Sequence, residues 1–558
     1  MKNYLYILFL GLSLQFGPST TDSASFTGDG PLYDYSAYTE CKSAPEDPLY
    51  GGGIIKNQSL GVYNRPHPPR FPVNSPAFVL NNLTGNTIYC FSSWVKITAG
   101  AASAVIKASL TTDNVTFNCM GTVIAKRGCW SFLKGGFVLD SPSTYALIYF
   151  QNSDGQPISI SVSSASLQPF TDQQWKINQQ NMLNTERKRT ATLHVSDIDG
   201  NRLQGATVVV EQVSRDFPFG SAIANTILGN LPYQNLLGVT RLVRGHNIFW
   251  EDPDFTPSWV RNLTSSELKS AVSSRIQSLM NQYRNEFIHW DVDNEMLHWD
   301  FYEQRLGPNA SLEFFQTAQK SDPLARLFMN EYNVLETCDD MNSTVDHYVA
   351  RLQELGEGGV SMDGIGLEGH FTVPNPPLIR AILDKLATLK LPIWLTEVDI
   401  SNSLDQETQV RRQRIANTTL YTNLNHQESF SSRTFLNYTA HSILILQAKY
   451  LEVVVREGFS HPSVKGIMLW TALHPSGCYR MCLTDNNFHN LPAGDVVDSL
   501  LKEWETGVVK GETDDHGAFD FSGFLGEYRV TVDYGNRTTN STFSLCQDDE
   551  TKHWNIHL

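Results

Sequence analysis

Two glutamates end short apolar runs that predict β-strands, and their positions would suit paired carboxylate chemistry. Glu295 ends the run "IHWDVDNE" between tryptophans, and Glu397 ends "PIWLTE". One such glutamate alone is most often solvated surface. Two carboxyl groups that face each other across a cleft can instead share the breaking of an acetal bond, one as proton donor and one as nucleophile. The aromatic neighbours of Glu295 would suit a sugar ring.

Four further predicted strand ends carry polar or aromatic side chains. They are His246 and Trp250 in "RGHNIFW", Glu331, Tyr332 and Asn333 in "NEYN", Glu368 and His370 in "GIGLEGHF", and Trp470 in "GIMLW". Each one alone is compatible with packing or with solvated surface. Six such ends in chain order favour one shared site, because the carboxyl ends of the strands build the active site of a (β/α)8 barrel.

The pattern of apolar residues divides the chain into regions. Residues 25–170 contain short apolar runs separated by Gly, Pro, Asn and Ser, which predicts a β-sandwich. Residues 171–191 are polar and helix-compatible, and we interpret them as a linker. Residues 192–505 alternate strands and helices, which predicts a parallel sheet, closed or open. Residues 506–558 return to short strands and form a β extension, which we expect to pair with the similar run at 192–212.

One helix can be predicted in detail within the third region. Thr264 and Glu267 have the spacing of a capping box, which fixes a helix start. The following apolar residues recur at helical spacing and would form one buried face. They are Leu268, Val272, Ile276, Leu279 and Tyr283.

Composition excludes some classes of partner. The 558-residue chain has 42 basic against 58 acidic residues, a net charge of −16, and no basic block. This argues against a nucleic-acid partner and against an anionic membrane surface. Residues 1–24, with Lys2 followed by "YLYILFLGL", predict a secretory signal peptide whose apolar core is too short to span a bilayer. Sequons such as Asn57 and Asn262 suit a secreted glycoprotein.

The cysteines allow bridges in an exported chain. Cys478 and Cys482 in "GCYRMC" are close enough to pair, and a metal site there lacks a neighbouring His/Cys pair to complete it. A pairing of Cys119 with Cys129 is sterically conceivable.

Several motifs in order resemble glycoside hydrolase family 10, the endo-1,4-β-xylanases. They are "VRGHNIFW", "WDVDNE", "GIGLEGHF", "WLTEVDI" and "GIMLWTAL". The order of the regions resembles the plant cell-wall members, and the sandwich, with "CMGTVIAKRGCWSFLKGGFVLD", resembles a family 22 carbohydrate-binding module. The resemblance implies a TIM (β/α)8-type barrel in 192–505 behind a jelly-roll-like sandwich in 25–170.

The resemblance also implies roles for individual residues. Glu295 would be the proton donor and acid/base, and Glu397 the nucleophile of a retaining hydrolysis. Asn294 would hydrogen-bond the sugar 2-hydroxyl, and His370 would orient the nucleophile. The remaining substrate-binding residues would be His246, Trp250 and Trp470 on the glycone side and Tyr332 on the aglycone side. No metal and no cofactor are implied.

Residue counting finds too little chain for one barrel strand. The first strand, "FPFGSAI", ends at Ile223, and the strand with "RGHN" begins near Arg241. The span from Ile223 to Arg241 holds 19 residues. A helix, a second strand and another helix would need about 50, since one βαβ unit takes about 30 or more. The sequence therefore predicts seven strands of eight, without the strand-2 residues that grip substrate in the family.

The chain differs from the family pattern in two further features. Val410 to Gln447, 38 residues, interrupts what would otherwise be one amphipathic helix. A retained in-frame intron and a genuine surface insertion both remain open for this segment. Asp293 stands where the family usually has an apolar residue, and a charge beside the cleft needs a partner.

Two functions are therefore weighed. The first is a secreted retaining endo-1,4-β-xylanase that acts on xylan in the plant cell wall (apoplast), and we expect it to be a monomer. The second is a catalytically impaired protein that binds wall polysaccharide, because the strand-2 segment is missing.

Overall fold

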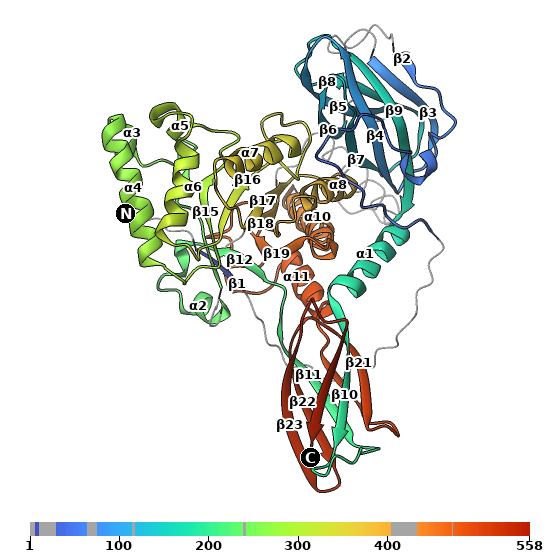
Figure 1. Ribbon diagram of the computed structural model, residues 1–558, viewed down its shortest axis with the longest axis vertical. Helices are drawn as coiled ribbons and strands as arrows, with labels where there is room; N and C mark the ends of the chain where they lie inside the picture. The colour runs from blue at the N-terminus through green and yellow to red at the C-terminus, as the bar shows by residue number, and fades with distance from the viewer. Residues whose placement is uncertain are drawn as a thin grey trace.

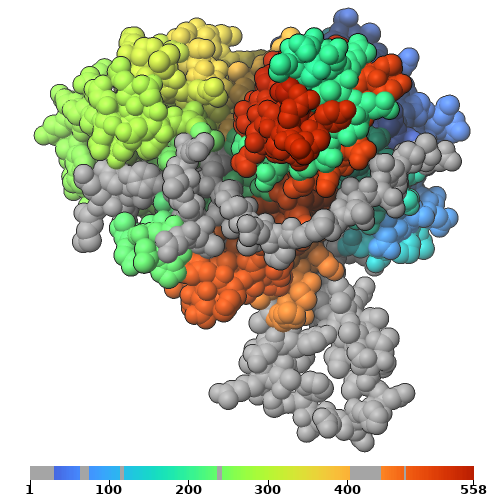
Figure 2. All heavy atoms as spheres, turned by 90° about the horizontal axis from the view of Figure 1, so that it is seen from below, coloured from blue at the N-terminus to red at the C-terminus, as the bar shows by residue number. Residues whose placement is uncertain are grey.

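The computed structural model describes residues 6–9, 30–63, 75–113, 118–237, 242–402, 432–470 and 473–558. They form an N-terminal β-sandwich, a barrel of strands and helices, and a small C-terminal β-sandwich (Figure 1). Seen from below, the small C-terminal unit stands in front, with barrel helices on one side of it and the N-terminal sandwich on the other (Figure 2).

The N-terminal sandwich consists of two antiparallel sheets. One has the order β2 (Gly61–Tyr63), β3 (Ser75–Leu83), β8 (Ser143–Asn152), β5 (Ser103–Thr112) and β6 (Asn118–Lys126), and the other β7 (Ser131–Leu139), β4 (Thr87–Ala99) and β9 (Ser159–Thr171). Apolar residues such as Phe91, Phe137 and Phe150 fill the space between them. The sandwich predicted for 25–170 therefore occupies the expected part of the chain. The predicted linker forms helix α1 (Asp172–Glu186), which the Thr171 side chain caps.

The small C-terminal unit is built from both ends of the barrel region. One sheet contains β21 (Ala518–Phe524), β10 (Lys188–Ser196) and β24 (Thr551–His557), and the other β20 (Val508–Glu512), β11 (Thr207–Arg215), β22 (Gly526–Tyr534) and β23 (Arg537–Leu545). The expected pairing of 192–212 with the tail is confirmed by these ladders. The expected barrel start at 192 lies inside β10, because alternate residues Leu193 and Val195 are buried in this unit's own core.

The barrel sheet contains seven parallel strands among the described residues. They are β12 (Phe219–Ile223), β13 (Val243–Gly245), β15 (His289–Asn294), β16 (Leu327–Glu331), β17 (Gly364–Phe371), β18 (Ile393–Ile400) and β19 (Val464–Leu469), with the short β14 (Phe249–Trp250) continuing beside β15. The larger surrounding helices are α4 (Ser265–Gln282), α6 (Ala310–Ser321), α7 (Val345–Glu357), α8 (Pro376–Ala387), α10 (Ser432–Ser460) and α11 (Pro492–Glu503). The described residues also contain the short helices α2 (Leu231–Leu237), α3 (Ser258–Arg261) and α5 (Phe301–Leu306).

The N-terminal segment β1 (Tyr6–Phe9) closes the ring of strands. It lies between β12 and β13 and pairs antiparallel with both. Because β13 also pairs with β15, the ladder returns to its start. The described residues between Ile223 and Val243 form a 3-10 turn and α2 and contain no strand. The second place in the ring is thus held by residues from the predicted signal peptide.

Local sequence explains the helix that was predicted in detail. The Thr264 side chain accepts from the Glu267 backbone N–H, and Glu267 accepts from the Thr264 N–H at 2.8 Å, so the capping box is confirmed. Leu268, Val272 and Ile276 are buried as expected. Tyr283 lies at the helix end and is only partly buried.

Large rings fill the barrel interior at the amino ends of the strands. Phe328 of β16 and Trp394 of β18 belong to one buried cluster there. A Cβ at Gly364 would lie 2.2 Å from the Phe328 ring, and one at Gly466 would lie 2.3 Å from Trp394. The glycines therefore make room for the two rings on neighbouring strands.

The atypical segment 410–447 is described only in part. Residues 403–431 lie outside the described residues, and those from Ser432 onward belong to α10. Gln447 is buried, and its side-chain amide donates to the Ile400 carbonyl at 2.7 Å. The end of the predicted insertion is thereby tied to the end of β18.

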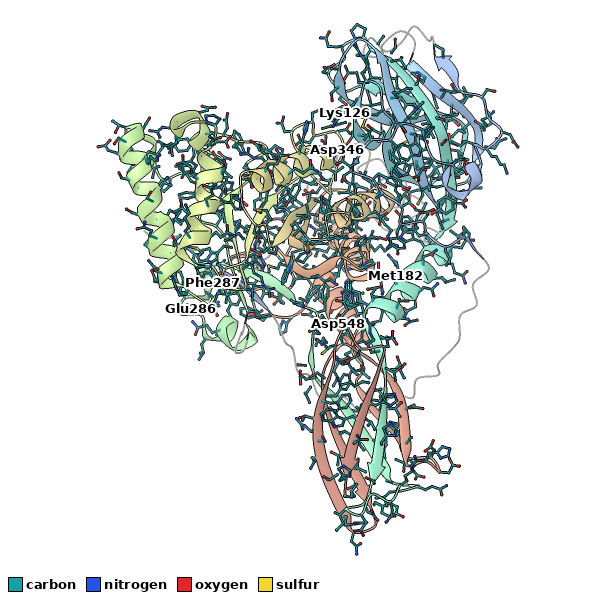
Figure 3. All side chains as sticks on the ribbon, in the orientation of Figure 1. Lys126, Met182, Glu286, Phe287, Asp346 and Asp548 are labelled. Carbon is teal, nitrogen blue, oxygen red and sulfur yellow. A yellow bond between two sulfur atoms is a disulfide. The ribbon has the colours of Figure 1, made fainter. Side chains whose placement is uncertain are left out.

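The N-terminal sandwich is docked on the barrel through β7 and α8 (Figure 1). Lys134 forms an ion pair with Asp384 at 2.6 Å, and both side chains are buried. A backbone N–H of β6, at Ile124, donates to Asp346 at 2.8 Å. Figure 3 labels Asp346 beside Lys126 at this junction. The contacts give the two units one fixed arrangement.

Three disulfides form among the described cysteines. Cys478–Cys482 confirms the predicted loop bridge. The conceivable Cys119–Cys129 pair is not formed, because Cys119 bonds Cys338 across the sandwich–barrel junction and Cys129 bonds Cys41. Within the described ranges, no helix has the length and apolar character needed to cross a bilayer.

Candidate active site

Glu397 lies near the carboxyl end of β18, at the centre of a buried polar network. The Arg244 guanidinium lies 3.2 Å from its Oε1, and the Asn330 amide donates to the same oxygen at 3.0 Å. His246 Nδ1 lies 3.6 Å away. Arg244 also donates to the Thr396 carbonyl and forms an ion pair with Asp291. Side chains from β13 and β16, and His246 just after β13, thus hold one carboxylate in place.

The network keeps Glu397 ionised. Burial alone would raise the pKa of Glu397, but His246, His370 and Arg244 outweigh it and hold the pKa below its ordinary value. A carboxylate held as an anion with little freedom to rotate is well suited to nucleophilic attack.

Glu295 follows β15 and is almost fully buried, with a backbone φ of +58°. Its N–H donates to the Asn330 carbonyl at 3.1 Å, which fixes the turn. Burial raises the pKa of Glu295 to about 8, with further contributions from the charges of Glu331 and Glu397. The two predicted catalytic carboxyl groups therefore differ in protonation near neutral pH, as an acid and a nucleophile must.

A third carboxyl group, Glu368 of β17, lies opposite Glu397 in the ladder. His370 Nε2 lies 3.3 Å from Glu368 and 3.7 Å from Glu397, while its Nδ1 contacts Asp399 at 2.9 Å. Burial alone would lower the pKa of His370, but Asp399, Glu368 and Glu397 raise it above its ordinary value. A protonated His370 can therefore form ion pairs with both Glu368 and Glu397.

Donor atoms of Glu368, His370 and Glu397 also lie within 4.8 Å of one another, a spacing that a metal ion could use. The raised pKa of His370 opposes this use, because a ligating imidazole must lose its proton.

Aromatic side chains stand around the carboxyl groups. The His246 ring lies 5.9 Å from Trp250 and 5.4 Å from Trp470. His370 lies 6.3 Å from Trp470 and 6.0 Å from Tyr479. The predicted residues His246, Trp250, His370 and Trp470 thus form one continuous aromatic group at the carboxyl ends of the strands.

Tyr332 lies on a different part of the rim. Its ring stacks on His298 at 3.8 Å. His298 contacts Glu331 at 2.7 Å and Asp340 at 3.0 Å. Burial opposes the proton on His298, but these two carboxylates raise its pKa to about 9. The tyrosine is therefore held flat against a charged imidazole.

Asn294 offers a free donor to this site. Its Oδ1 accepts from Asn330 at 2.9 Å, while its Nδ2 is buried without a partner among the described residues. A buried amide donor is costly unless something accepts its hydrogen bond. Asn294 is thus preset to donate to a bound hydroxyl.

Comparisons with known proteins agree with this geometry. The pattern of Glycosyl hydrolase family 10 matches residues 238–477. The chain is 31% identical over 510 residues to endo-1,4-beta-xylanase 5 of Arabidopsis thaliana, covering 82% of this chain and 81% of that protein. It is 29% identical over 587 residues to endo-1,4-beta-xylanase 4 of the same plant, covering 93% of each. The chain belongs to glycosyl hydrolase family 10.

Solved structures are also similar to part of the chain. The crystal structure of xylanase 10B from Thermotoga maritima covers 47% of this chain and 74% of its own, at 22% identity and a TM-score of 0.35. The family match to this chain begins at residue 238, after β12 and α2.

Several residues of this family 10 site were missed in the sequence. Arg244, Asn330 and Asp291 contact the site, but all three lie inside strands, where a polar residue gives no strand-end signal. The one usable signal was a charge or amide within an otherwise apolar strand. Asp399, the partner of His370, carried the same signal in "TEVDI".

Asp293, the unusual acid in this family 10 chain, has a carboxyl partner. Both Asp293 and Glu251 are fully buried beside α5 and α6, and the Tyr302 N–H donates to Glu251 at 2.9 Å. Burial raises the pKa of Asp293 to about 7, and burial together with the charge of Asp293 raises that of Glu251 to about 10. Each carboxyl group shifts the pKa of the other, so one proton shared between them at neutral pH would give Asp293 the partner that a buried acid needs.

Proposed function

We propose that the protein is a retaining endo-1,4-β-xylanase that hydrolyses xylan of the plant cell wall. The observation that carries the proposal is the division of protonation between two carboxyl groups, with Glu295 protonated and Glu397 ionised. The names of the Arabidopsis relatives supply the substrate class.

The reaction would proceed in two displacements. In the first, the Glu397 carboxylate attacks the anomeric carbon while Glu295 gives its proton to the departing glycosidic oxygen, leaving a glycosyl ester on Glu397. In the second, Glu295 takes a proton from water, which attacks the same carbon and releases Glu397. Each displacement inverts the configuration at the anomeric carbon once, so the product retains the β configuration.

The surrounding residues support this assignment. The unpartnered Asn294 amide could donate to the sugar 2-hydroxyl, and the His370 contact would keep one Glu397 oxygen from rotating. From the family resemblance we assign His246, Trp250 and Trp470 to the glycone side, and their rings form one group. We assign Tyr332 to the aglycone side, where it stacks on His298.

We further propose that the chain is exported to the apoplast as a monomeric glycoprotein and that its N-terminal sandwich binds wall polysaccharide. The signal-like residues 1–24 and the sequons motivate the route. The rigid docking of the sandwich beside the barrel would keep bound polysaccharide near the site.

A second candidate is a binder with impaired catalysis, and one observation favours it. The place between β12 and β13 is held by Tyr6–Phe9, whose sequence "YILF" contains no amide and no charged group. From the family resemblance, charged and amide side chains that bind substrate are expected at this place. The segment Tyr6–Phe9 supplies none of them.

Hydrolysis of soluble xylan separates the two candidates. The enzyme proposal predicts new reducing ends from the full chain and none from Glu397→Gln at the same concentration. Xylan retained by both proteins, without new reducing ends from either, would favour the binder.

A further inference from the structure

A second cavity lies at the amino ends of the barrel strands, the end of the barrel opposite to Glu295 and Glu397. Its volume is about 290 Å³, and the barrel, α11 and the small C-terminal unit all contribute to its lining. Gln547, one lining residue, is next to Asp548, which Figure 3 labels where the C-terminal sheets meet the barrel. The volume is at the small end of the range for ligand pockets.

Two aromatic walls face this cavity. The barrel supplies Phe328 and Trp394, the interior rings at the base of β16 and β18. Phe459 and Trp504, which stack on each other at 3.9 Å, form a second aromatic group in the lining. Walls of this kind favour a flat, apolar ligand body.

The lining is cationic although the chain is acidic. It contains Arg187, Arg215, Arg326 and Lys465 against a single carboxylate, Asp216. The whole chain, in contrast, carries a net charge of −16. A concentration of positive charge in such a chain favours an anionic ligand.

Arg187 is the most informative of these cations. It is buried, and its guanidinium donates only to backbone carbonyls, those of Phe459, His461 and Val464. No carboxylate of the described residues lies within ion-pair distance of it. Burial lowers its pKa to about 10, and its charge in turn adds to the lowering of the pKa of Lys465. A buried charge without a contacting counter-ion is costly. A bound anion would therefore offset the repulsion between Arg187 and Lys465.

Unpartnered hydrogen-bonding atoms lie around the same cavity. The Trp504 Nε1–H, the Arg215 Nε–H and the His289 Nε2 atom are buried without partners among the residues that the structure describes. Trp504 and His289 are 4% and 1% exposed. The two N–H donors, on Trp504 and Arg215, would be satisfied by acceptor oxygens.

We propose that this cavity binds a small aromatic monocarboxylate, with its carboxylate at the cationic side chains and its ring between the two aromatic walls. The charge selects the anion, the walls select a planar ring, and the volume limits the ligand to about ten to fifteen non-hydrogen atoms. Inorganic phosphate would satisfy the charge but leave the aromatic walls unfilled. Of the lining cations, Arg215 already pairs with Glu505, and Lys465 donates to the Gln547 side chain at 3.0 Å. A neutral aromatic alcohol would fill the walls but would bring no counter-charge to Arg187, Arg326 and Lys465.

The test is titration of the full chain with 4-fluorobenzoate, followed by ¹⁹F NMR and calorimetry. The proposal predicts a dissociation constant of about 1 mM or tighter for so small a ligand. Cyclohexanecarboxylate should bind about fivefold more weakly, because it lacks the ring face. 4-Fluorobenzyl alcohol and phosphate should each bind about tenfold more weakly.

Two variants locate the site. Arg326→Gln removes an exposed cation of the lining and should weaken 4-fluorobenzoate about tenfold. Trp504→Phe keeps a ring against Phe459 but removes the indole N–H, and should weaken it about threefold. Arg261→Gln, an exposed arginine on α3, is the matched control and should leave binding unchanged.

Three results would overturn the proposal. They are no binding at 20 mM, a value about twentyfold above the expected constant, affinity for phosphate or the alcohol equal to that for 4-fluorobenzoate, and binding that Arg326→Gln leaves intact. Because Arg326 is exposed, its variant should fold even if Trp504→Phe does not. The readout is binding at the amino end of the barrel, so the outcome is independent of xylanase activity.

Discussion

Glu397 is the residue on which the proposed chemistry depends most. Glu397→Gln replaces the attacking carboxylate by a neutral amide that cannot form the glycosyl ester. We expect turnover of an aryl β-xyloside to fall by about 10⁴-fold. Glu512→Gln, an exposed change on β20, is the control and should have no effect. Residual turnover within tenfold of the parent chain would sink the assignment.

Glu295 should behave differently, because its role is to protonate the leaving oxygen. With a good leaving group, Glu295→Gln should leave formation of the glycosyl ester nearly intact and slow its hydrolysis, so that the ester accumulates. With a poor leaving group, the first step should slow as well. Burst kinetics on a series of aryl xylosides measure both steps. Equal losses across the series would argue against Glu295 as the acid/base.

The two pKa shifts set the pH dependence of kcat/KM. Glu295 must be protonated, and its pKa of about 8 predicts a loss of activity as pH rises through 8. Glu397 must be ionised, and its lowered pKa predicts that the acidic loss begins only below the ordinary glutamate value. Rates on a poor leaving group between pH 3 and 10 check this. A basic limb that survives in Glu295→Gln would assign it to another group.

The Asp293–Glu251 pair makes a prediction about stability. Both folded pKa values are raised, so the folded state loses stability as pH rises from the ordinary carboxyl range through about 7 for Asp293 and through about 10 for Glu251. Asp293→Asn should therefore stabilise the chain by about 1–3 kcal/mol at pH 8 and much less at pH 4.5, since an amide can donate to Glu251. Denaturant unfolding at both pH values measures this. Asp548→Asn is the exposed control; an equal gain at both pH values would contradict the shared-proton account.

At this scale the sequence predicted the residues whose signal is local. Glu295 and Glu397 could be found because each ends an apolar run. Arg244 and Asn330 could not, since their contacts with Glu397 depend on which strands become neighbours in the ring. The partner of Asp293 was missed for the same reason: Glu251 lies on a different segment of the chain.

Among the elements, β1 has the least expected position. The count of seven barrel strands followed from the length of the segment after Ile223. The pairing of Tyr6–Phe9 with β12 and β13 could not be predicted, because an apolar run at the N-terminus is typical of a signal peptide. The direction of pairing could not be predicted either, because the run Tyr6–Phe9 is apolar throughout and shows no alternation of buried and exposed residues.

The position of β1 predicts that its backbone hydrogen bonds stabilise the barrel. In a chain that keeps residues 1–24, Ile7→Pro removes a ladder donor between Ala222 and Arg244. We expect a loss of about 3 kcal/mol, whereas Ile7→Val should cost less than about 1.5 kcal/mol. Thermal unfolding measures both. Equal stability of the two variants would show that β1 does not support the ring.

Export would remove β1, because Tyr6–Phe9 lie within the predicted signal peptide. If the leader is removed at about Ala24, β12 and β13 lose their shared neighbour and expose unpaired edges. Limited proteolysis of the secreted form should then cut the barrel while the N-terminal sandwich, which has its own core, resists. A barrel of the cleaved form that resists protease as well as the uncleaved chain would refute this expectation.

For the whole molecule, the junction between sandwich and barrel should matter for stability. Lys134 and Asp384 form a buried pair, and Asp384 also accepts from Tyr33 at 2.8 Å. Lys134→Met leaves a buried carboxylate without its cation and should cost about 3–5 kcal/mol. Lys107→Met breaks the more exposed pair with Asp339 and should cost about 1 kcal/mol or less. Denaturant unfolding compares the two, and similar losses would contradict a docked, buried interface.

The central claim concerns the whole enzyme acting on its polymer, and product stereochemistry tests it most directly. The full chain is mixed with soluble xylan, and the first new reducing ends are followed by ¹H NMR before mutarotation. The account predicts β-anomers first, formed by the parent chain and absent with Glu397→Gln. First-formed α-anomers, or no new reducing ends from the full chain, would contradict it.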